Sequence, residues 1–238
     1  MMMVTADEQR SPWARPQGDA LGELVRELDM ADAKLAGAPA EEILAWAFDR
    51  FGDDVVVTSS FQDCVLADLA ARLRPGLTVV FLDTGFHFAE TLAYLRRVEQ
   101  VLGIAVQKVS ANLPEDVHPC GSERCCELRK VAPLREVLAT KAAWVTGVKR
   151  IDTLERREAR AVAWDAGKQV VKVNPIVAWS EEDVEAYIAE RSLPRHPLTY
   201  VGYASIGCAP TTRPIAEGED PRAGRWADSA KTECGLHL

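Results

Sequence analysis

Short apolar runs alternate with segments of helical period along the middle of the chain, and this alternation constrains the fold more than any other feature. The apolar runs cover residues 55–57, 79–82, 104–106 and 144–146. Between them lie segments such as 65–73 and 88–101, in which apolar residues recur at helical spacing. Strands that alternate with helices in this way form parallel sheets with helices on both faces. We therefore predict an α/β fold built on a parallel sheet.

The two ends of the chain differ from this central part. Residues 1–18 show no apolar period and contain Pro12, Pro16 and Gly18, so we expect a disordered leader. Residues 19–197 are expected to form the α/β domain, which opens with two amphipathic helices over 21–35 and 43–51. From residue 198 onward Gly, Pro and charged residues become frequent, which favours a partly ordered tail over 198–238.

Composition and charge exclude two classes of partner. The formal net charge is -8, so the chain lacks the broad basic surface that binds nucleic acid. No apolar stretch approaches the roughly 18 to 20 residues that span a bilayer, and no apolar signal region follows the first methionines. We expect a cytoplasmic protein with neither a nucleic-acid nor a membrane partner. In that reducing compartment six cysteines indicate metal binding or catalysis rather than disulfides.

Polar residues follow the first two predicted strands, where ligands bind in sheets of this kind. Ser59 and Ser60 offer hydroxyl and backbone N–H groups to a phosphate, although an ordinary helix cap uses the same residues. The segment Asp83, Thr84 and Gly85 suits the polar edge of a nucleotide, although it is also a common strand-to-helix turn.

Cationic residues follow the fourth apolar run and recur in the tail. They are Lys149, Arg150, Arg156, Arg222 and Arg225. Guanidinium groups grip phosphate or sulfate oxygens and neutralise the charge that grows on a leaving phosphate. A local cluster of these residues would let an acidic protein hold an anionic substrate. For the residues around 156 a solvated helix face is the alternative.

Three cysteines have the character of metal ligands. Cys125 and Cys126 are adjacent and do not easily pair with each other, but both thiolates can ligate one iron–sulfur cluster. Cys208 adds a third thiolate, and Thr211 stands where Cys-x-x-Cys spacing would place the fourth. Taken alone, this set is better explained as three unrelated buried thiols.

Cys234, near the end of the chain, is interpreted as a nucleophile. Gly235 and His237 flank it and Lys231 is close in sequence, and positive charge favours a thiolate. A terminal segment with few apolar anchors is usually mobile, so its thiol can move between a pocket and an outside reductant. The two groups of cysteines together suggest sulfur redox chemistry.

Eight motifs occur in a specific order: TSSFQD at 58–63, LDTGFHF at 82–88, CCELRK at 125–130, TGVKR at 146–150, KVNPIVAW at 172–179, SIGCAP at 205–210, GRW at 224–226 and KTECGLH at 231–237. In this order they resemble the assimilatory adenylyl-sulfate reductases, relatives of the phosphoadenylyl-sulfate reductases with an adenine-nucleotide-hydrolase-like (PP-loop) fold. The resemblance covers the chain from about residue 55 to its end. Each motif is weak alone, but the ordered set is highly specific.

The resemblance implies a reaction and a substrate site. Cys234 would attack the sulfur of adenylyl sulfate and expel AMP, and thioredoxin or a similar dithiol would release sulfite from the resulting S-sulfonate, in sulfate assimilation. Lys130 would lie between a cluster and the substrate. The nucleotide would be held by Ser59, Ser60, Asp83, Thr84 and Gly85, and the phosphosulfate would face Lys149, Arg150, Arg156, Arg222, Arg225 and His237.

The same resemblance implies that Cys125, Cys126 and Cys208 ligate a 4Fe-4S cluster, but the chain departs from the pattern at Thr211. A threonine is a poor iron ligand, so the cluster is expected to be incomplete, labile or absent. Cys120 can replace the missing ligand only if the fold brings it close to the other three.

Several alternatives stay open. Adenylyl sulfate is favoured over its 3'-phosphorylated relative because the cysteine pair and Cys208 are retained, but a phosphoadenylyl-sulfate reductase is the nearest alternative. Because the ligand set is incomplete, a non-catalytic iron–sulfur redox protein is a further alternative. An ATP-dependent thiolation or amide-forming enzyme would need a glycine-rich pyrophosphate loop, which residues 59–63 lack. The sequence is compatible with a monomer and with a homo-oligomer.

Overall fold

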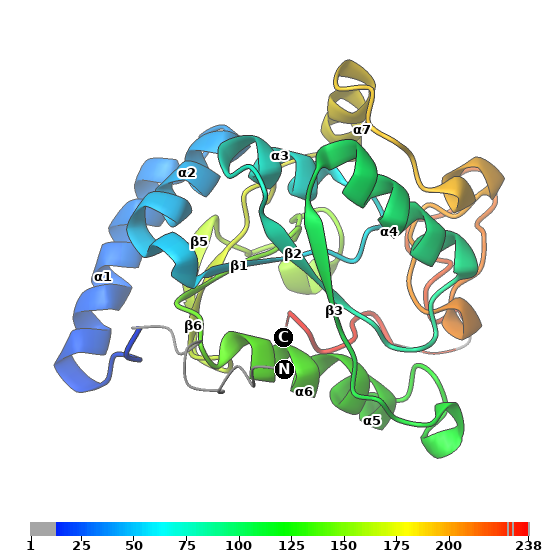
Figure 1. Ribbon diagram of the computed structural model, residues 1–238, viewed down its shortest axis with the longest axis horizontal. Helices are drawn as coiled ribbons and strands as arrows, with labels where there is room; N and C mark the ends of the chain where they lie inside the picture. Colours follow the sequence, from blue (N-terminus) through cyan, green and yellow to red (C-terminus); the bar gives the residue numbers. More distant parts are fainter. Residues whose placement is uncertain (1–12, 228, 230, 238) are drawn as a thin grey trace, which may run out of the picture.

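The computed structural model describes residues 13–227, 229 and 231–237, and a six-stranded sheet lies at its centre (Figure 1). The strand order is β3-β2-β1-β4-β6-β5, and neighbouring strands are parallel except for β5 and β6. The predicted α/β fold is therefore confirmed, with a mostly parallel sheet. The strands are β1 (Val55–Thr58), β2 (Thr78–Leu82), β3 (Ala105–Val109), β4 (Ala143–Val145), β5 (Val162–Asp165) and β6 (Val170–Val173).

Helices cover both faces of the sheet (Figure 1). They are α1 (Gly18–Leu35), α2 (Ala40–Phe51), α3 (Val65–Leu73), α4 (Ala89–Leu102), α5 (Glu123–Cys126), α6 (Ala132–Leu138) and α7 (Glu181–Glu190). Helices α1 to α4 and α7 contribute to one apolar layer, and α6 packs on the opposite face. The two predicted opening helices correspond to α1 and α2.

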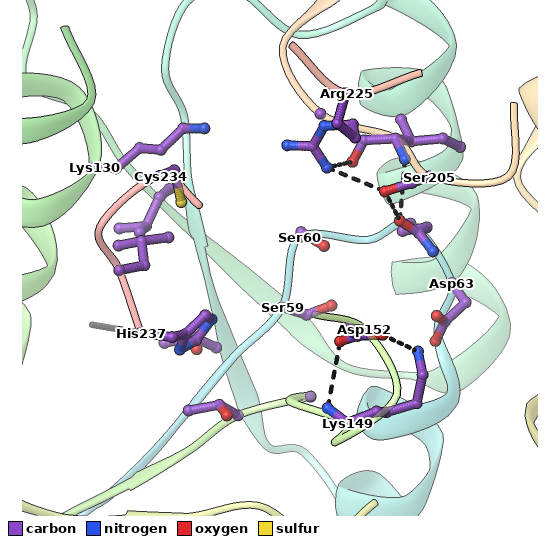
Figure 2. A pocket seen from close by; sticks show the side chains of 18 of the residues that line it. Ser59, Ser60, Asp63, Lys130, Lys149, Asp152, Ser205, Arg225, Cys234 and His237 are labelled. Atoms are coloured by element: carbon purple, nitrogen blue, oxygen red, sulfur yellow. Dashed lines mark hydrogen bonds and ion pairs between the residues drawn. The ribbon is translucent and has the colours of Figure 1, made fainter. Parts of the chain in front are cut away.

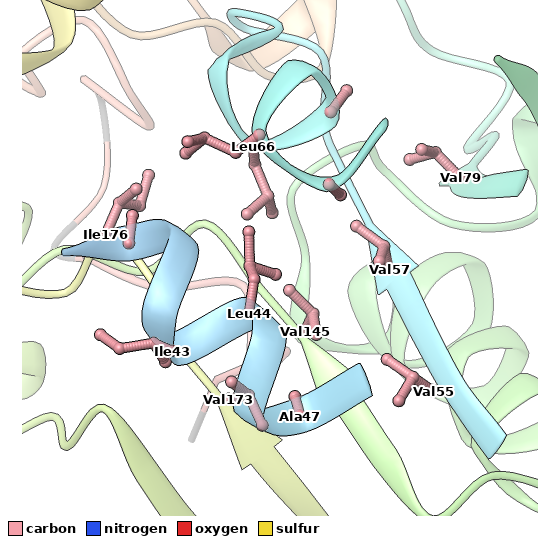
Figure 3. Packing of buried hydrophobic residues seen from close by; sticks show 14 of the residues in the cluster. Ile43, Leu44, Ala47, Val55, Val57, Leu66, Val79, Val145, Val173 and Ile176 are labelled. Atoms are coloured by element: carbon pink, nitrogen blue, oxygen red, sulfur yellow. The ribbon is translucent and has the colours of Figure 1, made fainter. Parts of the chain in front are cut away.

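Successive residues of β1 point to opposite faces, which explains how one short strand supports both layers. Val55 and Val57 pack in the layer of α2 and α3, where Leu44 is fully buried (Figure 3). Val56 packs instead in the layer of α6. Burying a leucine side chain in such a layer stabilises the fold by about 2 kcal/mol.

The pair β5 and β6 departs from the prediction of a purely parallel sheet. Val162 pairs with Val173 in antiparallel register, and only residues 166–169 connect the two strands. A parallel connection needs a crossover of a dozen or more residues, so this short link allows only a hairpin. Gln169 takes the positive φ of 53° that closes the turn. The hairpin forms one edge of the sheet and leaves the arrangement of β1, β2 and β4 unchanged.

Both ends of the described chain are packed against the domain. Trp13 lies edge-on to Phe51 at 5.7 Å, and Arg15 donates a hydrogen bond to Gln169 at 3.1 Å, so residues 13–17 of the expected leader are anchored. Residues 1–12 of that leader lie outside the described residues. The segment after residue 198 contributes the buried side chains of Ile206 and Trp226. Its glycines and prolines form turns between anchored residues, which is why it folds despite its weak apolar period.

The helices that the structure describes include none long and apolar enough to cross a membrane.

Candidate active site

A cavity of about 230 Å³ opens beyond the carboxyl ends of β1, β2 and β4. Its walls come from the loop after β1, from the segments after β4 and from residues of the C-terminal segment. Figure 2 shows Cys234 and Lys130 on one side and Lys149 with Asp152 on the other. Parallel sheets place their ligand sites at this edge. Parts of the chain that are far apart in sequence therefore meet here.

The loop after β1 is fixed by local hydrogen bonds. The Ser59 hydroxyl accepts a hydrogen bond from the Phe61 N–H at 3.0 Å. Phe61 adopts a positive φ of 53°, and its fully buried ring packs edge-on to Phe81 at 6.0 Å. Gln62 accepts a hydrogen bond from the Ile206 N–H at 3.0 Å and so joins this loop to the opposite wall. Ser59 and Ser60 both line the cavity.

Five of the predicted cations line the same cavity: Lys130, Lys149, Arg156, Arg222 and Arg225. The sixth, Arg150, is exposed and donates to the Ala159 carbonyl at 2.8 Å, so it lies outside the cavity. The chain turns at this point, because the Arg150 N–H bonds to the Val177 carbonyl and fixes the backbone.

Two of these cations are held by carboxylates. Lys149 lies 3.1 Å from Asp152 and 3.3 Å from Glu181, and Arg156 lies 2.8 Å from Asp152. Burial disfavours the charged form of Lys149, but the two carboxylates outweigh it and raise the pKa of the ammonium. Both cations therefore stay charged at the cavity wall.

Arg225 has hydrogen-bonding capacity to spare. Its guanidinium donates to the Ser205 hydroxyl at 3.2 Å and is stacked over the Trp226 ring at 4.6 Å. The buried Nε has no hydrogen-bond partner among the described residues. An unsatisfied buried donor costs about 1–3 kcal/mol, so this group is suited to a ligand oxygen.

Cys234 is partly exposed and faces the charges of the cavity. Its sulfur lies within electrostatic range of the cationic groups of Lys130, Arg156 and Arg225. The segment that carries Cys234 is docked in the described structure, with its thiol at the cavity.

His237 also lines the cavity. Its ring stacks on Trp144 with centroids 5.3 Å apart and an angle of 10° between the planes. Burial, followed by the nearby Lys172 and Arg156 charges, holds the pKa of His237 well below its usual range. The imidazole is therefore neutral at physiological pH, and its buried Nδ1 lacks a partner within the described chain.

Glu233, next to the predicted nucleophile, was missed by the sequence analysis. Its side chain is buried and accepts two hydrogen bonds from Arg156, at 2.6 and 2.8 Å. The Thr153 hydroxyl adds a third at 3.1 Å. The signal was present in the motif at 231–237, where an acidic residue precedes the cysteine. Asp152, Gln62, His87 and Gly207 also line the cavity without having been predicted.

The predicted metal-ligand cysteines surround a second, much smaller cavity. Cys125, Cys126, Cys208, Thr84 and Thr211 line it, and Lys130 lines both cavities. A π-helical turn over Glu127–Val131 joins α5 to α6 and carries Lys130 between them. Such turns within helices are frequent at functional sites. Lys130 therefore lies between the larger cavity and the cysteines.

Of the turn formed by Asp83, Thr84 and Gly85, only Thr84 lines this second cavity. The Thr84 hydroxyl lies 3.5 Å from the Cys208 sulfur, and the Thr84 carbonyl accepts from Arg129 at 3.0 Å. None of the three residues lines the larger cavity. The strand β2 ends beside the cysteines, so Thr84 in the following turn contacts Cys208.

Within the described residues, no three His, Cys, Asp or Glu side chains converge as a single metal ion would require. Cys120 and Cys208 nevertheless lie within hydrogen-bond reach of each other. This hydrogen bond outweighs burial and lowers the pKa of Cys208 to about 4, while that of Cys120 is raised.

Comparison with known proteins identifies relatives along nearly the whole chain. Curated "Adenosine 5'-phosphosulfate reductase" proteins are 45% identical over 224 residues in Mycolicibacterium smegmatis, covering 90% of this chain and 95% of that protein, and 46% identical over 218 residues in Streptomyces coelicolor, covering 88% and 92%. A third, from Mycobacteroides abscessus, is 47% identical over 214 residues, covering 86% and 90%.

Solved structures share the fold. The phosphoadenylyl-sulfate reductase from Candida auris, in a phosphate complex, superposes with a TM-score of 0.67 at 21% identity, over 84% of this chain and 99% of that one. The FMN adenylyltransferase from Candida glabrata has a TM-score of 0.57 at 12% identity, over 76% and 67%. At these identities the likeness concerns the fold alone. The profile of the phosphoadenosine phosphosulfate reductase domain matches residues 54–214. With that match and its close curated relatives, the chain belongs to the phosphoadenosine phosphosulfate reductase family.

Proposed function

We propose that the protein reduces adenylyl sulfate to sulfite and AMP in sulfate assimilation, with Cys234 as the nucleophile. The observation that carries this proposal is the Cys234 thiol at a cavity lined by five cationic side chains and by the Ser59–Ser60 loop. The names of the relatives support the same substrate.

The cavity offers groups for each part of the substrate. Hydroxyl and backbone N–H groups of Ser59 and Ser60 suit the nucleotide phosphate. The free Nε of Arg225 and the ammonium of Lys130 suit the sulfate oxygens near Cys234. Arg156 and Lys149 stabilise the negative charge that develops on the departing AMP phosphate.

The reaction proceeds in two steps. The Cys234 thiolate attacks the substrate sulfur, an S–S bond forms, and the S–O bond to AMP breaks with its electron pair on the phosphate oxygen. A thiolate of an external dithiol then attacks the Cys234 sulfur, and sulfite leaves with the electron pair of the S–S bond. The second thiol of the partner resolves the mixed disulfide, so the dithiol supplies the two electrons that reduce the sulfur.

A thioredoxin-like dithiol is part of this proposal, because the adduct needs an outside reductant. A cytoplasmic location belongs to it as well, since all six cysteines are free and thiols stay reduced in that compartment. The proposal is the same for a monomer and for a homo-oligomer, because the named cavity residues come from one chain.

The sulfur atoms that line the small cavity are of the kind that ligate an iron–sulfur cofactor. Cys125, Cys126 and Cys208 are free thiols around one space, and cationic Lys130 and Lys231 are directed to them. Those three cysteines would hold a 4Fe-4S cluster. When bound, the cluster supplies a charged centre close to the substrate. Lys130 lines both cavities and so links this centre electrostatically to the substrate sulfate.

The experiment is mass spectrometry of the protein mixed with adenylyl sulfate in the absence of reductant. We expect a mass gain of one sulfonate on the peptide that contains Cys234, and none in Cys234→Ser. Cys64→Ser is the matched control, because Cys64 is buried away from the cavity and should leave the adduct intact. An adduct on another cysteine, or sulfite release by Cys234→Ser, would contradict the assignment.

Substrate choice is tested by kcat/KM for adenylyl sulfate and for its 3'-phosphorylated relative. We expect adenylyl sulfate to be preferred. The reverse preference would make the protein a phosphoadenylyl-sulfate reductase with the same Cys234 chemistry. No turnover of either nucleotide, together with a redox-dependent absorbance, would instead support the non-catalytic iron–sulfur protein.

A further inference from the structure

The turn that precedes α5 lies against Thr211. Gly121 occupies this turn with a positive φ of 87°, and a Cβ at Gly121 would lie 2.7 Å from the Thr211 Cγ2. Ser122 caps α5 by accepting a hydrogen bond from the Cys125 N–H at 3.2 Å. The Gly121 carbonyl also accepts from Lys231 at 2.8 Å. The turn is therefore fixed beside the position at which the fourth cysteine is missing.

Cys120 precedes this glycine, and its thiol lies among the other cysteines. It is within hydrogen-bond reach of the Cys208 sulfur, and the charge of Cys125 acts on it. Cys125 and Cys126 come from α5, whereas Cys208 comes from the segment at 205–210. Cys125, Cys126 and Cys208 line the small cavity together with Gly121, the residue that follows Cys120, whereas Thr211 contributes an alcohol.

The surroundings match the charge of a cluster held by four thiolates. Four thiolate ligands leave such a cluster with a net negative charge. Lys231 donates to the Cys126 sulfur at 3.1 Å, and Lys130 faces the thiols of Cys126 and Cys208. These two ammonium groups can balance that charge. Hydrogen bonds to the sulfurs are also a known means of tuning iron–sulfur clusters.

We propose that Cys120 supplies the fourth thiolate ligand of a 4Fe-4S cluster, together with Cys125, Cys126 and Cys208, and so replaces the ligand missing at Thr211. The ligand has moved from the segment after Cys208 to the turn before α5. The two positions are neighbours in space because Gly121 packs on Thr211. This proposal concerns the cofactor and is independent of which nucleotide the protein reduces.

The test is iron and acid-labile sulfide analysis of the full chain purified without oxygen, together with its absorption and electron paramagnetic resonance spectra. We expect about four irons and four sulfides per chain. Cys120→Ala should fall to three irons or fewer, with the spectrum of a three-iron cluster or none. The double variant Cys120→Ala/Thr211→Cys should return to about four, because a cysteine at 211 restores the missing ligand.

Cys64→Ala is the matched control, because Cys64 is a free buried cysteine that lines neither cavity. It should keep the iron content and spectrum of the parent chain. Circular dichroism of each variant separates loss of a ligand from loss of the fold. Four irons in folded Cys120→Ala would overturn the proposal. An iron-free parent chain after anaerobic reconstitution, with Cys120 and Cys208 joined in a disulfide, would overturn it as well. Because these readings need no substrate, either failure leaves the role of Cys234 to its own test.

Discussion

The contact between Glu233 and Arg156 is predicted to hold the catalytic segment in the cavity. Glu233 is buried and accepts two hydrogen bonds from the Arg156 guanidinium and one from the Thr153 hydroxyl. The partly exposed Cys234 follows it directly. In the proposed reaction an external dithiol must reach the Cys234 sulfur, which requires the segment to leave the cavity during turnover. Replacing Glu233 by Gln removes the charge with little change of shape.

The size of the effect follows from the geometry. Removing one partner of a buried ion pair costs about 3–5 kcal/mol when the other charge is left alone. Here Arg156 keeps its 2.8 Å contact with Asp152, and Gln retains one acceptor oxygen. We therefore expect the docked state to lose about 2–3 kcal/mol relative to the undocked state. That corresponds to a roughly 30- to 150-fold larger undocked population.

Trypsin provides the assay, because cleavage after Lys231 requires the docked segment to open. In the docked state Lys231 is bonded to the Gly121 carbonyl and to the Cys126 sulfur. When opening and closing are fast relative to cleavage, the cleavage rate reports the open population. We expect release of the peptide 232–238, followed by mass spectrometry, to accelerate roughly 30- to 150-fold in Glu233→Gln. The cleavage rate of each variant is divided by that of a free peptide 226–238 of the same sequence, which removes any effect of the substitution on trypsin itself.

Glu155→Gln is the matched control. Its carboxylate accepts a hydrogen bond from the Thr232 hydroxyl at 2.8 Å, so it contacts the same segment, but it is fully exposed. Exposed contacts of this kind contribute little to stability. We expect its cleavage rate to match the parent chain. Equal rates in Glu233→Gln and Glu155→Gln would refute the conclusion that the buried ion pair docks the segment.

Two further predictions concern the cavity wall and the core. Gly207→Ala would push a methyl group into the Arg225 guanidinium, which is hydrogen-bonded to Ser205. We therefore expect the KM for adenylyl sulfate to rise about tenfold or more, with little change in the thermal midpoint. An unchanged KM would exclude Arg225 from substrate binding. Burial lowers the pKa of His196 to about 4, so the unfolded chain binds the extra proton between that value and about 6.5, and stability falls as pH drops through this window. Urea titrations from pH 7 to pH 4 should show that this residue lowers the free energy of unfolding by up to about 3 kcal/mol. In His196→Gln that part of the pH dependence should be absent, and its persistence would contradict the assignment.

The parts of the fold that could be predicted were those with a clear period. The run 55–57 is buried on both faces of the sheet, so it reads as a short apolar strand, and α3 follows at helical spacing. The strands β5 and β6 lack such a signal, because each is short and carries a polar or charged residue. Their pairing depends on a turn in which Gln169 adopts a positive φ, and a glutamine does not predict that conformation.

The same division holds in the site. Ser59, Ser60 and Lys149 follow predicted strands, and the edge of a parallel sheet brings them together. That rule also led to the turn at Thr84, which lies at the correct edge but faces the cysteines. Strand order decides between the two cavities, and order along the sheet is not a local property of the sequence. Glu233 was missed because a buried carboxylate is recognised only through its partner Arg156.

The proposed role of Cys120 illustrates why spacing along the sequence is an incomplete guide to metal ligands. A threonine at position 211 suggests a lost ligand only while ligands are sought at fixed intervals along the chain. Thr211 and Gly121 are 90 positions apart in sequence, yet a single added carbon at Gly121 would reach the threonine methyl group. A turn that needs a glycine at this point can carry a neighbouring thiol to the same cavity. A sulfur lost from one wall can therefore be replaced from another, provided that the backbone of the second wall approaches as closely as Gly121 permits.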